Sequence, residues 1–142
     1  MAITITQTDI EAVWGSVFVA QWSNAGAVVQ SPVVNTSRVT TAIRNGTSYV
    51  NGRLNNGPYS IPLTANDPLA PPPEVVDCMA TYAGWWLFKT SGIKYTKDTL
   101  KWVEDNKARI DRMLMSIQIG NYPLDAVMNT ARQQTPRVAS GW

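Results

Sequence analysis

The segment from residue 73 to residue 90, PEVVDCMATYAGWWLFKT, predicts a helix that is apolar over most of its circumference. At about 100° per residue, Cys78, Tyr82 and Trp85 fall outside the main stripe, which consists of Val75, Val76, Met79, Ala80, Ala83, Trp86 and Leu87. A helix of this kind is usually buried on several sides, and a chain of 142 residues has little material to cover it. We therefore expect part of this helix, including Tyr82 and Trp85, to face another subunit.

A second segment, about 97–119, has the clearest helical period in the chain. Thr96 is a suitable N-cap for it, and Gly120 suits its C-terminus. Its apolar stripe consists of Leu100, Val103, Ile110, Leu114 and Ile117, with lysine, arginine and aspartate mostly on the opposite face. Asp105 and Arg109 are four residues apart, so we expect them to pair along this helix.

Residues 37–55 predict a third helix, for which Thr36 or Ser37 is the expected cap. Glycine inside a helix costs about 1 kcal/mol relative to alanine. It often marks a place where a neighbouring segment comes close, so Gly46 and Gly52 indicate tight packing.

A helix near the N-terminus is expected from a capping box formed by Thr8 and Glu11. Gly15 interrupts it, and the residues that follow either continue this helix or start a second short one. The predicted fold class is therefore all-α, a small bundle of about four helices with a long proline-rich loop and an extended C-terminal tail. We expect residues 1–125 to form the helical domain and residues 126–142 to form the tail.

The loop lies within residues 51–77, which contain six of the nine prolines. Loops of this length are uncommon inside compact domains and are usually functional or disordered. Prolines lower the entropy that a loop loses when it is ordered in an interface. Tyr59, Ile61 and Leu63 are therefore candidates for a subunit interface, while a strap that covers the chain's own core is an equally open interpretation.

The composition also favours assembly. Charged residues make up 15% of the chain, compared with about 25% in typical soluble domains. Six tryptophans and five tyrosines add to the apolar surface, and such surface is often buried against another subunit. The net charge of +2 does not favour nucleic acid or an anionic membrane as the main partner. The N-terminus lacks the features of a signal peptide and no apolar run is long enough to span a membrane, so we expect a soluble protein.

The residues give little support for catalysis, and we predict no catalytic, cofactor-binding or metal site. The chain has no histidine, and its one cysteine, Cys78, lies among apolar residues and is expected to be buried. Asp67, Glu74 and Asp77 are close in sequence, but turn and helix N-terminal positions explain them better than a metal does. The lysines between residues 89 and 107 alternate with acids, which favours a solvated helix face over a nucleic-acid surface.

Four motifs follow one another in the middle of the chain: AIRNGTSYVNGRL, YSIPL, PPEVVDCMATYAGWWLF and RIDRMLMSIQIGNYPL. In this order they resemble the head–tail connector, or adaptor, proteins of long-tailed bacteriophages, particularly the Mu-like branch. The matching positions are Ser48, Tyr49, Val50, Arg53, Leu54, Pro62, Leu63, Pro73, Val76, Ala80, Leu87, Leu114, Ile117, Gly120 and Leu124. The chain departs from the family where the tyrosine expected after Arg53 is displaced to Tyr59, and where Trp85 and Trp86 enlarge an otherwise alanine-rich helix.

The resemblance implies a virion protein that assembles as a ring, usually a dodecamer, under the portal at the phage neck. Its implied partners are copies of itself, the portal protein, a downstream neck or tail-completion protein, and DNA that passes through the channel without sequence-specific binding. Family members commonly dock on the portal through an extended C-terminal segment. Here this segment would run from about residue 127 to residue 142, with Arg132, Arg137 and Trp142 as candidate anchors. Assembly would take place in the host cytoplasm.

Two other functions stay open. The basic helix around Lys94–Arg112 suggests a small helical DNA-binding regulator, although no recognition helix rich in arginine, asparagine or glutamine follows a short turn. An enzyme of unknown class has only the carboxylates noted above in its favour. If the interface prediction is right, Trp85→Ala affects assembly more than the stability of the monomer.

Overall fold

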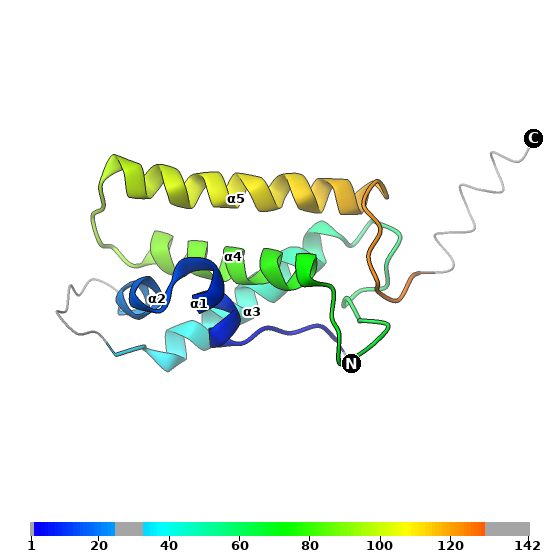
Figure 1. Ribbon diagram of the computed structural model, residues 1–142, viewed down its shortest axis with the longest axis horizontal. Coiled ribbons are helices and arrows are strands. Elements are labelled where there is room, and N and C mark those ends of the chain that lie inside the picture. The colour runs from blue at the N-terminus through cyan, green and yellow to red at the C-terminus, as the bar shows by residue number, and fades with distance from the viewer. Residues whose placement is uncertain (1, 25–32, 130–142) are drawn as a thin grey trace, which may run out of the picture.

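Five α-helices form the part of the chain that the computed structural model describes, residues 2–24 and 33–129 (Figure 1). They are α1 (Gln7–Trp14), α2 (Ser16–Ser23), α3 (Thr36–Arg53), α4 (Pro73–Thr90) and α5 (Lys97–Gln118). Within these residues no β-strand forms, and the predicted all-α class is confirmed. The helix count exceeds the expected four because Gly15, with φ of +94°, separates α1 from α2.

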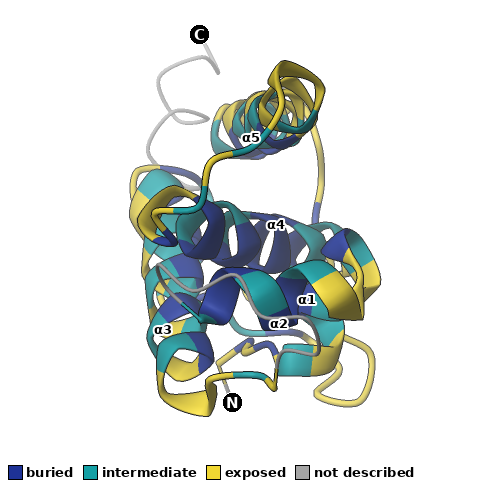
Figure 2. Ribbon diagram, turned by 90° about the vertical axis from the view of Figure 1, so that its left-hand side faces the viewer, coloured by how far each residue is buried: buried dark blue, intermediate teal, exposed yellow. Residues whose placement is uncertain are grey.

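Helix α4 lies at the centre of the bundle and packs against each of the other four helices. In Figure 2, α5 covers it from one side while α3 and the α1–α2 pair lie on its other sides. Its own chain therefore covers α4 on most sides, and the expectation that part of the helix faces another subunit stays a prediction. Four of its large side chains, Val76, Tyr82, Trp85 and Trp86, stay half-buried.

Two glycines allow this close packing around α4. A Cβ atom at Gly46 of α3 would overlap the backbone carbonyl of Met79, so the predicted close approach is confirmed there. A Cβ atom at Gly84 would overlap the indole ring of Trp14 in the same way. Gly52 has no neighbour within 4 Å of such an atom, so the same prediction is wrong at that position.

The caps of α5 follow the prediction. The Thr96 side-chain oxygen accepts a hydrogen bond from the Thr99 amide at 3.3 Å. Gly120, with φ of +84°, follows the last turn and donates its amide to the Ile117 carbonyl. These two residues fix the ends of the helix within one residue of the expected bounds.

The caps of the earlier helices differ from the prediction. Asn35, rather than Thr36 or Ser37, caps α3, and its side chain accepts a hydrogen bond from the Arg38 amide at 3.3 Å. Helix α1 begins two residues earlier than the Thr8 capping box implies, because Asp9 accepts the Thr6 amide at 2.8 Å. The Thr–x–x–Asp spacing offers the same reciprocal hydrogen bonds as the Thr–x–x–Glu spacing two residues later.

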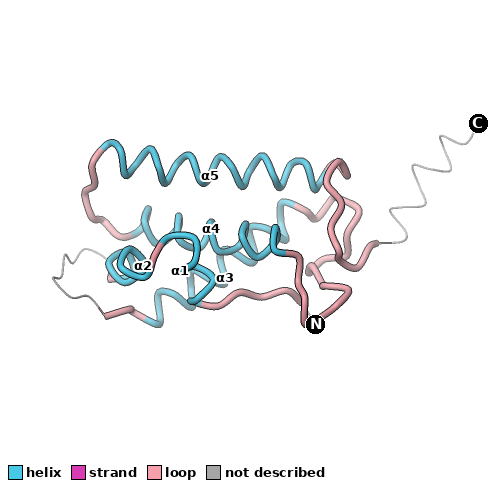
Figure 3. The backbone as a smooth tube through the Cα atoms, in the orientation of Figure 1, coloured by secondary structure: helices cyan, strands magenta, loops and turns pink. Residues whose placement is uncertain are grey.

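The connection between α3 and α4, residues 54–72, lies over one end of the bundle (Figure 3). Tyr59 and Leu63 are 3% and 0% exposed, so they belong to the core of their own chain and their prediction as subunit-interface residues is wrong. The Tyr59 hydroxyl accepts the Leu124 amide at 2.6 Å. Ile61 is half-buried.

Residues 126–129 belong with this connection rather than with a separate tail. Isolated β-bridges join Ala126 to Ala65 and Met128 to Tyr59, and the Asn129 amide donates to the Pro58 carbonyl at 2.8 Å. The helical domain therefore extends four residues beyond the predicted boundary at residue 126. Residues 130–142 are outside the described part of the chain. None of the described helices has the length and hydropathy that a bilayer crossing requires.

Candidate assembly surface

Tyr82 and Trp85, two of the predicted interface residues, lie in a half-exposed cluster that joins α3, α4 and α5. We call it the Lys107 cluster, and its members are Tyr49, Arg53, Tyr82, Trp85, Lys107 and Asp111. Each helix contributes a pair of residues three or four positions apart, and such pairs lie on one face of a helix. These faces of α3, α4 and α5 contact one another through the side chains of the cluster.

The ammonium group of Lys107 is surrounded by three aromatic rings. Its Nζ lies 5.0 Å from the centroid of the Tyr49 ring, 5.9 Å from that of Tyr82 and 5.0 Å from that of Trp85. The Tyr49 and Tyr82 rings stack at 4.0 Å with an interplanar angle of 12°. A cation held over ring faces gains about 0.5–2 kcal/mol per contact, more when water is excluded. The Lys107 side chain is 18% exposed, so this contact is partly shielded.

Asp111 completes the cluster by accepting hydrogen bonds from three of its members. One carboxylate oxygen accepts from Lys107 Nζ at 2.8 Å, and the other accepts from the Tyr49 hydroxyl at 2.6 Å and from Arg53 at 3.1 Å. Burial raises the pKa of Asp111, but the hydrogen bonds from Lys107 and Tyr49 and the nearby positive charges outweigh it, so the pKa lies below its ordinary value. Burial lowers the pKa of Lys107, but its bonds to Asp111 and Tyr49 outweigh burial and raise it.

Both shifts keep Lys107 and Asp111 ionised at neutral pH. A lysine with a raised pKa is a poor general base, and general acid–base catalysis works best with a pKa near the operating pH. The cluster is therefore better suited to binding than to proton transfer. Tryptophan, tyrosine and arginine are also the residues that most often dominate the energy of protein interfaces.

Lys107 and Asp111 were missed by the sequence-based prediction, which assigned the lysines of this helix to a solvated face. A signal was present, because Lys107 lies only about 20° around the helix from Leu114, inside the arc of the apolar stripe. Leu114 is 1% exposed, so a lysine at that angle needs a partner in the interior.

The other candidate residues do not gather at this surface. Arg132, Arg137 and Trp142 lie outside the described residues. Cys78 is fully buried, as predicted, and burial together with the Asp77 charge raises its pKa to about 12. This thiol is therefore inert at neutral pH.

The three acids considered for a metal site have separate roles. The Asp67 carboxylate accepts the Leu69 amide at 2.9 Å in a turn, and Glu74 lies in the first turn of α4. Asp77 pairs with Arg109 of α5 at 2.6 Å. Among the described residues, no group of three or more acids or cysteines is arranged to hold a metal ion.

Most of the basic residues on α5 are engaged with acids. The predicted pair of Asp105 with Arg109 is wrong, because Arg109 bonds Asp77 on α4 and Asp105 bonds Lys101 at 2.7 Å. Lys89 of α4 bonds Glu104 at 2.9 Å in the same way. Among the described residues, Lys97 and Arg112 of α5 form no ion pair, so only part of the positive charge on this helix is neutralised.

A second surface feature lies at the C-terminal end of α5. Met115 and Ile119 are 57% and 63% exposed and are four residues apart, so they form one apolar patch on the helix. Met115 also follows Asp111 by four residues, so this patch adjoins the Lys107 cluster along α5.

No protein-family model matches the chain, and no curated protein matches its sequence. The assignment of a function therefore depends on the motifs quoted above and on these surfaces.

Proposed function

We propose that the chain is a structural protein of the bacteriophage neck, which forms a ring at the head–tail interface, joins the portal to the next component and extends the DNA channel. The placement of the motif positions carries the proposal. Eight of the matched apolar residues are buried in one core: Val50, Leu54, Leu63, Ala80, Leu87, Leu114, Ile117 and Leu124. Residues that are far apart in the sequence thus meet in one packed unit, which a shared fold requires.

The surface supports assembly as well. A subunit in a ring presents a different surface to each of its two neighbours. The half-exposed Tyr82 and Trp85 of the Lys107 cluster, together with the adjoining patch of Met115 and Ile119, form one such surface along α5. Large exposed apolar side chains that lie next to each other are typical of interaction sites.

Light scattering of the purified chain, alone and mixed with the portal protein of the same virion, tests this proposal. We expect a complex that contains several copies of the chain for each portal ring. A Leu69→Ala variant is the control, because Leu69 is 94% exposed in the connection and belongs neither to the Lys107 cluster nor to the patch of Met115 and Ile119. A chain that stays monomeric and does not bind the portal contradicts the proposal, whereas a monomer without the portal does not, because such rings can form on their partner.

The runner-up function, a DNA-binding regulator, has less support because Lys89, Lys101, Lys107 and Arg109 already have carboxylate partners. It requires binding to duplex DNA that weakens steeply as salt increases. A gel-shift experiment at low salt that detects no complex removes this candidate.

A further inference from the structure

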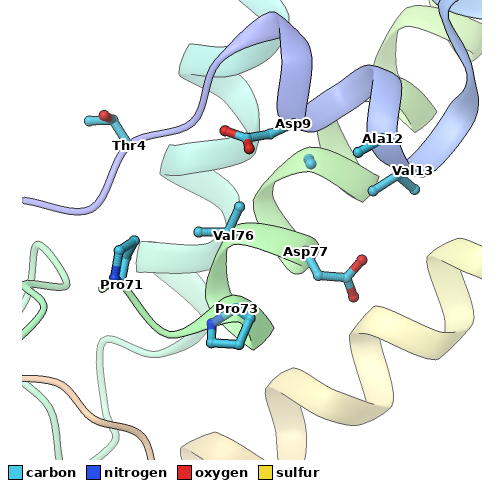
Figure 4. A pocket seen from close by; sticks show the side chains of 9 residues that line it. Thr4, Asp9, Ala12, Val13, Pro71, Pro73, Val76 and Asp77 are labelled. Carbon is cyan, nitrogen blue, oxygen red and sulfur yellow. The ribbon is translucent and has the colours of Figure 1, made fainter. Parts of the chain in front are cut away.

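A pocket of about 530 Å³ lies between α1 and the N-terminal half of α4 (Figure 4). Its floor is apolar and is formed by Val13 of α1 together with Val76 and Ala80 of α4, with Pro73 at its edge. This volume is in the range of about 300–1,000 Å³ that is usual for ligand sites. The Lys107 cluster does not contribute to it.

The pocket has an acidic character. Asp9 and Asp77 are its only charged lining residues within the described part of the chain. Asp77 is already paired with Arg109, whereas Asp9 uses one carboxylate oxygen for the Thr6 amide and hydroxyl. The other oxygen of Asp9 accepts no hydrogen bond from the described residues, so it is available to a basic group.

The chain itself contains a segment with the complementary chemistry. Residues 130–142, TARQQTPRVASGW, carry Arg132 and Arg137, no acid, and one aromatic side chain, Trp142. An arginine suits a carboxylate, and an indole suits an apolar floor rimmed by prolines.

The position at which the described chain ends also favours residues 130–142 as the segment that binds in this pocket. Ala126 pairs with Ala65, and Ala65 lines a small depression of about 130 Å³ that shares Thr4 and Pro71 with the larger pocket. Thirteen residues span at most about 45 Å when fully extended. A tethered segment also reaches effective concentrations of about 1 mM, so its own chain competes well with a second copy.

We propose that the pocket between α1 and α4 binds residues 130–142 of the same chain, with Trp142 over the apolar floor and an arginine beside Asp9. Docking of this kind requires neither a portal nor a ring, so it stands or fails separately from the phage function.

Disulfide trapping in the full chain tests the proposal. Ala12 is exposed and lines the pocket, so an Ala12→Cys, Ser140→Cys variant brings two thiols together when the segment is docked. Disulfides require Cα atoms within about 7 Å, which makes the reaction specific. The control is Ala108→Cys, Ser140→Cys, because Ala108 is exposed on α5 and does not line the pocket. Cys78 is fully buried and stays out of the reaction.

We expect the pocket variant to form an intrachain disulfide about tenfold faster than the control, because docking raises the local concentration of the two thiols. Adding Trp142→Ala, or the pair Arg132→Glu and Arg137→Glu, should return the rate to that of the control. Equal rates in the two variants would overturn the proposal, and so would a covalent dimer as the main product, because the occupant would then be a neighbouring copy. If Ala12→Cys disturbs the helical circular-dichroism signal, Thr4→Cys on the other side of the pocket gives the same comparison.

Discussion

Two clusters of aromatic side chains hold α4 and α5 to the rest of the chain, one on the side of α1 and α2 and one on the side of α3. The first, which we call the Trp22 cluster, consists of Trp14, Phe18, Trp22, Phe88, Tyr95 and Trp102. The Trp22 ring is fully buried and lies 5.2–6.4 Å from the other five ring centroids. The Lys107 cluster is instead organised around a cation and stays half-exposed.

The difference separates two uses of aromatic residues. Buried rings stabilise the fold through the area that they remove from water, which does not depend on pH or salt. Rings around a paired lysine fix the orientation of its side chain and keep exposed surface for a partner. Their gain in stability is smaller because solvent screens the charges. We therefore expect the Trp22 cluster to determine whether the monomer folds and the Lys107 cluster to determine what the folded monomer binds.

The largest effect is expected from Trp22→Ala. Truncation of a fully buried aromatic residue removes about 3–5 kcal/mol from the free energy of unfolding, which is a large part of the stability of a small domain. Urea unfolding followed by circular dichroism measures the loss, with Leu69→Ala as a control that should change little. A loss below about 1 kcal/mol would show that the rings contribute little packing energy.

Gly84→Ala tests the same cluster from the side of α4. The added methyl group overlaps the Trp14 ring, and overpacking of this kind costs about 1–3 kcal/mol. The matched control is Gly52→Ala, which meets no neighbour and should stabilise α3 by about 0.5–1 kcal/mol. If both variants shift the urea midpoint in the same direction, the contact between α1 and α4 is looser than described here.

Lys107→Ala is expected to cost less, about 1–2 kcal/mol, because it removes the ring contacts and one hydrogen bond to a charged group. Lys101→Ala is the control, since its pair with Asp105 is similar in geometry but the lysine side chain is 75% exposed, so the loss should stay below about 0.5 kcal/mol. Equal losses in urea unfolding would show that the ring cage adds nothing to the ion pair.

The smallest effect is the dependence of the Lys107 cluster on pH. The folded-state pKa of Asp111 is lowered, so its contribution to stability is complete above the ordinary pKa of the carboxyl group and is lost as the pH falls through the folded-state pKa. The advantage of the wild type over Asp111→Asn should therefore be present at pH 7 and shrink in strongly acidic solution. Urea unfolding at several pH values checks this, and a constant difference would contradict the assigned pKa shift. The difference between wild type and Trp22→Ala should be constant over the same range.

The sequence predicted those parts of the fold that depend on local patterns. The bounds of α5 follow from its strong periodicity and from Thr96 and Gly120, and the start of α4 follows from Pro73, and these three residues act within one turn of chain. The same reasoning failed for Arg109, whose partner Asp77 lies on another helix and becomes a neighbour only after folding. Helical spacing alone predicts a partner for Arg109 only on the same helix, and that predicted partner was Asp105.

The candidate site was harder to predict for the same reason. Trp85 and Tyr82 were singled out because they fall outside the apolar stripe of α4, and both are half-buried. Tyr59 and Leu63 were placed at an interface because they lie in a loop, and no local signal indicates that a loop folds back over its own core. For the same reason, a deletion that is meant to remove the tail without disturbing the fold should begin at residue 130, because the amides of Val127 and Asn129 donate hydrogen bonds to the connection between α3 and α4.

Native mass spectrometry of the chain mixed with the portal protein, compared between wild type and Trp85→Ala, tests the central claim most directly. Trp85 contacts Lys107 and Tyr82 but keeps exposed surface, so we expect the variant to remain folded and to lose copies from the complex that the wild type forms. Retention of the full number of copies by Trp85→Ala, together with a loss of stability as large as that of Trp22→Ala, would place Trp85 in the core and contradict the account.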